Sequence, residues 1–432
     1  MCKVVLGLGQ HPFRALAFVT TSARGRNQLA VTRRCDRPEG HRLKVGFLFN
    51  HSVAHQVAHS LPIAAAIAEF HPQVELTLFV CGGASEDEVR RLWSIAGHSK
   101  DDQRIEKLAP ATRTAEFLTK ASGDALPAER ISILSQNAAR FEELDALVVP
   151  EKTSTLLKTR FGLDRLALIH TRPGAGDRAI GFDKASGRFD LVLLSGEKIR
   201  QRLDDAGLLK PGGHAIVGYP KFDALLDQPY EPVFQNDRPT VLYNPHPSPA
   251  LSSWYRMGPQ VLEWFAQQDR FNLIFAPHVM LFARQLTVAL SPFSIAKVPE
   301  IPSRIAELPH IHIDKGSEKS VDMTYVRAAD IYLGDASSQV YEFLAEPRPC
   351  VFLNPNEHHW QDNPDFTHWQ TGRVAANLDE MKIALGNSLS SPDAFREVQE
   401  KLFAETFDLR SQRSSARAAD AIVSWLGENR AR

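Results

Sequence analysis

Residues 329–354 read ADIYLGDASSQVYEFLAEPRPCVFLN, and this stretch decides the fold. It opens on a short apolar run, 331–333, which is typical of a buried strand. Apolar residues then recur at helical spacing from Val340 to Leu344. Two prolines end that helix before a second apolar run, 350–353. The pattern predicts a strand, a polar loop, a helix and another strand, which is the repeating unit of a parallel α/β sheet.

The polar loop of this unit carries the side chains of Asp335, Ser337 and Ser338. Aspartate and serine are preferred at helix N-caps, so capping alone explains them. A helix N-terminus also offers unpaired N–H groups and a partial positive charge, and two hydroxyl groups beside it suit a phosphate. The sequence therefore supports two interpretations of this loop, a helix cap and a phosphate-binding seat.

Length and composition limit the classes of protein. The chain has 432 residues, which exceeds the size at which one hydrophobic core stops growing, so we expect two domains. The formal net charge of -1 provides no global basic field to recruit nucleic acid. The four cysteines share no C-x-x-C spacing, which fits free thiols in a reducing cytoplasm. No apolar run is long enough to cross a membrane.

Residues 1–42 differ from the rest because arginines outnumber acidic residues there. They lack the sustained apolar region of a signal peptide. We expect a disordered basic extension, and a weak contact with a lipid surface is the alternative.

From residue 43 onward, apolar runs alternate with helical patterns. The strands expected in a first domain are 44–49, 75–81, 145–149, 166–171, 191–195 and 215–218. Those expected in a second domain are 240–243, 272–275, 310–313, 331–333 and 350–353. Nearly continuous apolar strands separated by helices predict parallel sheets covered on both faces. The proline-rich run 227–239 is typical of a linker. It separates a domain of residues 43–226 from one of 240–391, and helices in 392–432 are then placed to pack back on the first domain.

Ligands of doubly wound sheets bind beyond the carboxyl ends of the strands, so the residues that follow each strand matter most. After the first strand, His51, His55 and His59 share one helical face. They suit the acceptor side of a cleft, and solvent-facing or capping histidines explain the pattern equally well. A metal site is less favoured, because no properly spaced third ligand accompanies them.

The strand at 166–171 runs into the loop HTRPGAGDRAIGF, residues 170–182. The polar and glycine residues of this loop make a tight turn that carries cations near the cleft. These residues are Arg172, Gly174, Gly176, Asp177 and Arg178. Arginine binds phosphate in a bidentate manner, which makes this a phosphate or acceptor loop. His170 has an ordinary pKa near neutrality and is a candidate general base. A glycine turn with a structural histidine is the alternative.

Polar side chains also follow three strands of the second domain. They are Asn244, His246, Ser248, Ser252 and Ser253 after the first, His278 after the second, and the Asp335 loop after a later one. Three polar strand ends in one domain are hard to assign to capping alone. We therefore expect a site for a phosphate or a nucleotide diphosphate there.

As a set, these motifs resemble the CDP-glycerol glycerophosphotransferase family. They are Tyr243-Asn244-Pro245, Ala276-Pro277-His278, Gly334-Asp335-Ala336-Ser337-Ser338 and Gly218-Tyr219-Pro220-Lys221-Phe222-Asp223. The resemblance covers roughly residues 160–375, and its motifs are moderately specific. It implies a GT-B fold, in which two Rossmann-like domains face each other across a cleft. It also implies a CDP-activated donor and an acceptor that is a polymer or is linked to a lipid.

One departure from the family matters. In the family's pattern a histidine thought to be catalytic precedes a glycine, and Pro173 stands in its place here. Proline cannot act as a base. Either His170 or His55 takes over this role, or activity is lost.

The sequence thus predicts an α/β protein of the GT-B class that moves an alditol phosphate from a CDP-activated donor to an acceptor hydroxyl, in the synthesis of a cell-surface polymer. The donor would be bound by His246, Ser248, His278, Asp335, Ser337 and Ser338, without a metal or another cofactor. The alternatives are a glycosyltransferase or epimerase that uses a UDP-sugar, and a non-catalytic relative that binds a nucleotide. We expect a cytoplasmic protein, and peripheral contact with the inner face of the plasma membrane is left open.

Overall fold

The computed structural model describes residues 42–50, 54–122, 126–226, 228–283, 285–290 and 293–430. Within these ranges, only the backbone is described for residues 54–55, 179–180, 288–290, 293–295 and 430. The basic extension predicted for residues 1–42 therefore lies outside the described residues, except for Arg42. His51 also lies outside them, and so does the side chain of His55.

The first sheet has seven strands, all parallel, in the order β3-β2-β1-β4-β5-β6-β7. The strands are β1 (Lys44–Phe49), β2 (Glu75–Val80), β3 (Ile105–Lys107), β4 (Ala146–Val149), β5 (Ala167–His170), β6 (Leu191–Leu194) and β7 (His214–Ile216). Every residue of β4 and β6 is buried, as their uninterrupted apolar sequences require. Helices follow the strands, and the main ones are α1 (Leu61–Phe70), α2 (Gly83–Ile95), α3 (Arg113–Ser122), α4 (Ala128–Gln136), α5 (Ala138–Glu142) and α7 (Glu197–Asp205).

The second sheet has six strands, also parallel, in the order β12-β9-β8-β13-β14-β15. These are β8 (Thr240–Asn244), β9 (Asn272–Phe275), β12 (Ile311–Ile313), β13 (Ile331–Gly334), β14 (Cys350–Leu353) and β15 (Arg373–Ala375). An antiparallel hairpin, β10 (Leu286–Leu290) and β11 (Phe293–Lys297), lies apart from it. The main helices around the second sheet are α9 (Trp254–Ala266), α12 (Gln339–Phe343) and α13 (Leu378–Ser390). In each sheet the first strand lies between the second and fourth, which creates a topological switch point beyond the strand ends.

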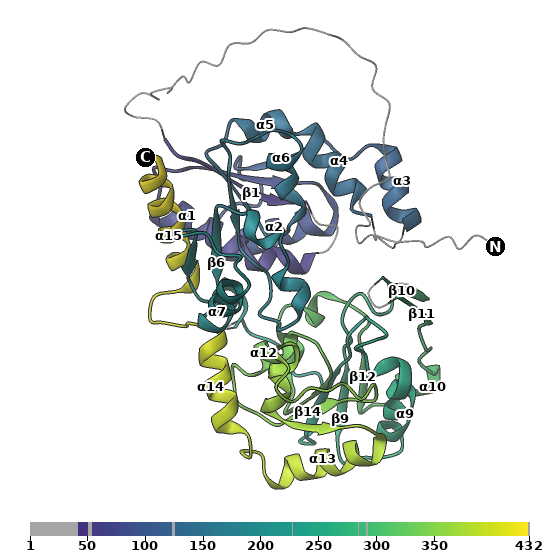
Figure 1. The fold of residues 1–432 in the computed structure, drawn as a ribbon. Helices are drawn as coiled ribbons and strands as arrows, with labels where there is room; N and C mark the ends of the chain where they lie inside the picture. Colours follow the sequence, from purple (N-terminus) through teal and green to yellow (C-terminus); the bar gives the residue numbers. More distant parts are fainter. Residues whose placement is uncertain are drawn as a thin grey trace, which may run out of the picture. The chain divides into compact units, whose positions relative to one another are not determined.

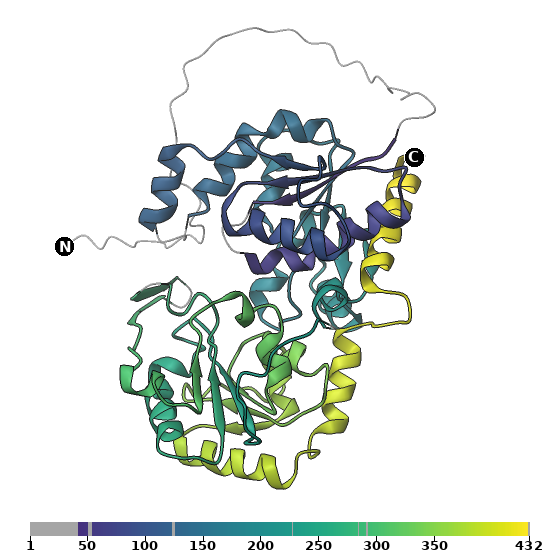
Figure 2. The ribbon, with the colours of Figure 1, turned by 180° about the vertical axis from the view of Figure 1, so that it is seen from behind.

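Of two helices near the end of the chain, one contacts the layers of both sheets and the other packs on the layers of the first sheet. Helix α14 (Arg396–Thr406) contacts both α7 and the 3-10 segment η6 (Pro364–Thr371), and α15 (Ser414–Arg430) lies along α1. Figures 1 and 2 show α15 in yellow beside the purple α1 in both views. Phe407, just after α14, contacts the rings of both Tyr219 and Tyr341. The apolar core is thus continuous from one sheet's layers to the other's.

The predicted fold class is confirmed. All eleven strands expected from the sequence are present, and those at 44–49, 272–275 and 350–353 have the predicted ends. Three elements were missed, namely β3, β15 and the β10–β11 hairpin. The two single strands have only three residues each. Helices α4 and α5 meet at Asn137, whose side chain bonds the backbone of Ala109 and Ile133.

Candidate functional site

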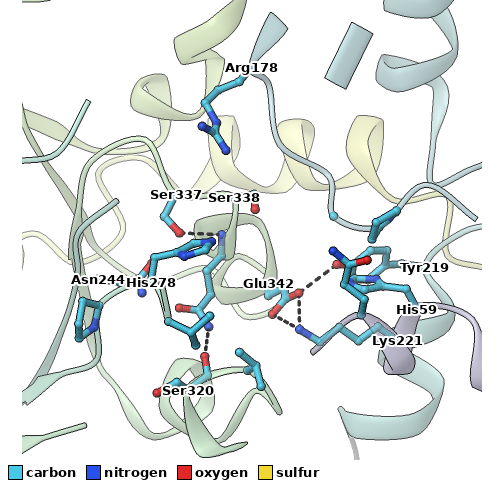
Figure 3. Close-up of a pocket in the computed structure, with 17 residues that line it drawn as sticks. His59, Arg178, Tyr219, Lys221, Asn244, His278, Ser320, Ser337, Ser338 and Glu342 are labelled. Carbon is cyan, nitrogen blue, oxygen red and sulfur yellow. Dashed lines mark hydrogen bonds and ion pairs between the residues drawn. The ribbon is translucent and has the colours of Figure 1, made fainter. Parts of the chain in front are cut away.

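A cavity of about 320 Å³ lies beyond the carboxyl ends of the strands of both sheets. Its walls come from η1 (Ala54–His59), the loop after β5, the turn after β7, the ends of β8 and β9, and the loop that leads into α12. Figure 3 shows the side chains that line it, among them His59, Arg178, Tyr219, Lys221, Asn244, His278, Ser320, Ser337, Ser338 and Glu342. We call this space the larger cavity.

Asp335 organises the loop after β13 instead of facing this cavity. Its side chain is fully buried, and its carboxylate accepts hydrogen bonds from the backbone N–H groups of His246, Ser253 and Ala336 and from the Ser253 hydroxyl. Burial raises the pKa of Asp335 to about 6, against the opposing effect of these donors. Asp335 therefore ties the loop after β13 to the loop after β8.

Ser337 and Ser338 both line the larger cavity, as a phosphate seat requires. Ser337 is buried, and its hydroxyl accepts a hydrogen bond from the backbone N–H of Gln339 at 3.4 Å. The helix that follows, α12, has only five residues, so its dipole contributes less than the sequence pattern suggested. Positive charge at this seat must therefore come mainly from side chains.

His278 also lines the larger cavity and is half-buried, with Nδ1 accepting from the backbone N–H of Met280 at 3.3 Å. His246 and Ser248 do not line it. The His246 side chain is buried, and its Nδ1 accepts from the backbone N–H of Ser248 at 3.0 Å. Burial holds the pKa of His246 well below its usual range. The structure thus gives these two residues a supporting position behind His278, whose ring centroid lies 5.9 Å from that of His246.

Arg178 supplies positive charge at the top of the larger cavity, where Figure 3 shows it pointing toward Ser337 and Ser338. It is half-buried, and burial lowers the pKa of its guanidinium group. Its side chain makes no hydrogen bond or ion pair with any residue that the structure describes. A guanidinium group in such surroundings is suited to bind an anionic ligand.

The floor of the larger cavity is a buried ion pair. Lys221 Nζ lies 2.7 and 2.8 Å from the two carboxylate oxygens of Glu342, and the Tyr219 hydroxyl donates to the same carboxylate at 3.0 Å. Lys221 belongs to the short helix α8 (Pro220–Leu225), which follows β7, and Glu342 belongs to α12, so the pair joins the two sheets' layers. Both charges are buried and mutually satisfied, as Figure 3 shows.

Asp177 lies close to this site but is committed to other contacts. Its buried carboxylate accepts from Lys198 Nζ at 2.9 Å, the Tyr341 hydroxyl at 2.6 Å and His368 Nδ1 at 2.9 Å. Burial favours a higher pKa for Asp177, but Lys198 and these hydrogen bonds outweigh it and hold the pKa below its usual range. Asp177 thereby joins the loop after β5 to α12 and η6.

His170 and Arg172 lie on a smaller cavity of about 220 Å³ that shares Pro173, Gly174, Arg178 and Ser338 with the larger one. The His170 ring is buried and stacked on Phe189, with centroids 4.3 Å apart. Burial lowers the pKa of His170 to about 3, so the ring is neutral near pH 7. Such a ring is a weak base.

The glycines of the loop after β5 allow it to approach the second sheet's layers closely. Gly174 has φ +77°, which favours glycine. A Cβ atom on Gly176 would lie 3.0 Å from Cβ of Ser338. A side chain at residue 176 would therefore require Ser338 to move by a few tenths of an ångström.

Several residues of this site were not among the residues predicted for it. His59 was considered only as one of three histidines on a helical face, and it lines the larger cavity on the first domain's side. Glu342 and His368 were not singled out at all, because neither has a sequence signal beyond its residue type. The described part of the chain contains no group of three or more His, Cys, Asp or Glu side chains that could hold a metal ion.

Comparison with known proteins supports the fold and leaves the family open. No protein-family model matches the chain, and no curated protein matches it. Among solved structures, a provisionally assigned UDP-N-acetylglucosamine 2-epimerase from Listeria monocytogenes is similar, with a TM-score of 0.61 at 14% identity, over 90% of this chain and 97% of that one. The S. aureus MnaA–UDP complex gives 0.58 at 12% identity, over 90% and 97%.

The wall teichoic acid polymerase TagF is also similar, with a TM-score of 0.51 at 11% identity, over 90% of each chain. At these identities the similarity establishes the fold alone, and that fold is GT-B. Separately, the helices in the described part of the chain are all too short or too polar to span a membrane.

Proposed function

We propose that this protein is a transferase that moves an alditol phosphate of the glycerophosphate type from a CDP-activated donor to an acceptor hydroxyl. The observation that supports it most is the larger cavity, where Ser337, Ser338 and His278 converge with the Arg178 guanidinium, which no described residue pairs with. Two hydroxyl groups, an imidazole and a cation form a suitable receptor for a diphosphate. The motif resemblance then favours the CDP-alditol as donor.

The reaction would be a displacement at the donor's β-phosphate. The acceptor oxygen forms a bond to that phosphorus, the bond to the bridging oxygen breaks, and CMP leaves. Arg178 would stabilise negative charge on the phosphate oxygens, and the acceptor hydroxyl would lose its proton to a base. We assign His59 as the candidate base, because it lines the larger cavity from the first domain whereas His170 is enclosed and weakly basic.

A UDP-sugar epimerase or glycosyltransferase is the second candidate. It is favoured by the similarity to the MnaA–UDP complex and to the structure from Listeria monocytogenes, both of which have higher TM-scores than TagF. Histidines on both walls of the larger cavity, His59 and His278, also suit proton transfer at a sugar carbon. Preference for uridine ligands over cytidine ligands would decide for it.

The decisive experiment is calorimetric titration of wild-type protein and of a Ser337→Ala, Ser338→Ala double variant with CDP-glycerol, CMP, UDP and UDP-N-acetylglucosamine. We expect the double variant to lose about tenfold or more in affinity for CDP-glycerol, because each hydrogen bond to a charged group contributes about 1.5 to 3 kcal/mol. Ser390→Ala, on exposed α13, is the matched control and should bind like wild type.

Each outcome of that titration has a definite meaning. Wild-type affinity in the double variant would remove the phosphate seat from the proposal. CDP-glycerol binding without turnover, across a panel of acceptors, would favour a non-catalytic binding protein and would point to Pro173. Restored turnover in Pro173→His would then locate the missing base.

A further inference from the structure

The smaller cavity contains positive charge that the protein itself does not neutralise. Arg172 and Arg178 both line it. Each guanidinium group has five N–H donors. Arg172 donates one, from Nη1 to the Gly181 carbonyl at 2.7 Å, while its Nε is buried without a partner. The Arg178 side chain has no hydrogen-bond partner within the described ranges. Buried donors and charges in this state are costly unless a ligand satisfies them.

The nearby carboxylates already have other partners. The Asp335 carboxylate, which acts on Arg178 electrostatically, accepts its hydrogen bonds from backbone N–H groups and the Ser253 hydroxyl. Asp183 lies 2.9 Å from Lys152, and Asp365 lies 3.0 Å from Arg202. The Asp177 carboxylate is occupied by Lys198 and His368. None of these acids forms an ion pair with Arg172 or Arg178, so the cavity keeps an excess of positive charge.

Arg172 is held in its position at a conformational cost. Its φ of 41° lies in the left-handed region, which non-glycine residues rarely adopt. Its guanidinium lies over the Phe182 ring, 4.4 Å from the centroid, and Arg202 lies 4.1 Å from the same centroid. Two like charges on one ring and a strained backbone are features that a fold retains where they serve a ligand.

We propose that the smaller cavity binds an oxyanion carried by the acceptor, with Arg172 as its specific ligand and Arg178 shared with the larger cavity. Calling the ligand the acceptor rests on the proposed function, whereas the anion site itself does not. The cavity of about 220 Å³ has room for a phosphate or carboxylate with a few attached carbons. Its shared wall with the larger cavity would place the acceptor's hydroxyl near the donor.

The test is titration of the whole protein, saturated with CDP, with glycerol 3-phosphate, glycerate and glycerol. Saturation with CDP keeps the probes out of the larger cavity. We expect glycerol 3-phosphate to bind wild type, and glycerol not to bind. Arg172→Gln should weaken that binding at least tenfold. It should leave CDP binding within threefold of wild type, because Arg172 lines the smaller cavity and does not line the larger one.

Two further variants make the result specific. Arg188→Gln removes an exposed cation from the same domain and lines neither cavity, so it should bind glycerol 3-phosphate like wild type. Arg172→Lys keeps the charge but not the forked set of N–H donors, so its affinity for glycerol 3-phosphate should lie between those of wild type and Arg172→Gln. This variant provides the test if Arg172→Gln folds poorly.

The outcomes separate this inference from the proposed function. Equal binding of glycerol 3-phosphate to wild type and Arg172→Gln, or none to wild type, overturns the anion site. If CDP fails to bind while glycerol 3-phosphate still binds in a manner that depends on Arg172, the proposed function falls and the anion site stands. Tighter binding of glycerate than of glycerol 3-phosphate keeps the site and makes the acceptor a carboxylate.

Discussion

At the scale of single residues, the surroundings of each histidine decide what it can do, because His59 and His170 are both buried. His170 is enclosed and stacked on Phe189, whereas His59 and His278 line the larger cavity. Nε2 of His170 lies 3.3 Å from the Pro150 carbonyl oxygen, and Nδ1 is buried without a partner. A protonated His170 would therefore be a buried charge, which is why its pKa is about 3.

This pKa predicts how stability depends on pH. The unfolded chain binds a proton at His170 below about pH 6.5, whereas the folded protein binds it only near pH 3, so protonation favours unfolding in between. This contribution to stability is present above pH 6.5 and is lost as the pH falls toward 3. His170→Phe keeps the stacking and cannot take up the proton. We expect its free energy of unfolding to lie within about 1 kcal/mol of wild type at pH 7.5.

Chemical denaturation of both proteins between pH 4 and 7.5 measures this difference. The variant should lose less stability than wild type on acidification, and it should retain donor turnover if His170 is not the base. Parallel stability curves would show that His170 is not buried as described. Loss of turnover with an unchanged fold would restore His170 as the catalytic residue.

At the scale of elements, His368 connects the two loops that face each other across the site. Its Nδ1 lies 2.9 Å from the Asp177 carboxylate and its Nε2 lies 3.0 Å from the backbone oxygen of Asp335. Through this ring, the loop after β5 and the loop after β13 hold each other in position.

We therefore expect His368→Gln to weaken both stability and donor binding. A glutamine cannot reach both partners. The buried Asp177 carboxylate then loses one of its donors, and this should lower the free energy of unfolding by about 1 to 3 kcal/mol. Denaturation and CDP-glycerol titration measure the two effects. His71→Gln removes a more exposed pairing with Asp420 and should cost about 1 kcal/mol or less, without an effect on binding. Equal effects of the two variants would contradict the coupling.

The same elements show what the sequence could and could not predict. Strands such as β4 and β6 were predictable because every residue is apolar and a loop follows directly. β3 was not, because Ile-Glu-Lys at a sheet edge has no strand pattern. Ser337 and His278 were predictable as site residues because they follow strands. Glu342 and His368 were not, since their partners are 121 and 191 residues away and only the tertiary structure brings them together.

At the scale of the whole molecule, a few buried polar contacts join the two sheets' layers. The Lys221–Glu342 pair is one of them, with side-chain exposures of 6% and 8%. Its desolvation cost is high, so its value lies in fixing how the two halves of the larger cavity meet.

Removing one partner should be far more harmful than removing both. Glu342→Gln leaves Lys221 as a buried, unpaired cation, and we expect a loss of about 3 to 5 kcal/mol in the free energy of unfolding. A Lys221→Met, Glu342→Leu double variant leaves no buried charge and should recover most of that loss. Denaturation of wild type, of the Lys221→Met and Glu342→Leu single variants and of the double variant gives the coupling energy directly. Additive effects would show that the pair does not form. Recovered stability with weakened CDP-glycerol binding would show instead that the pair is retained because it aligns the two domains around the donor.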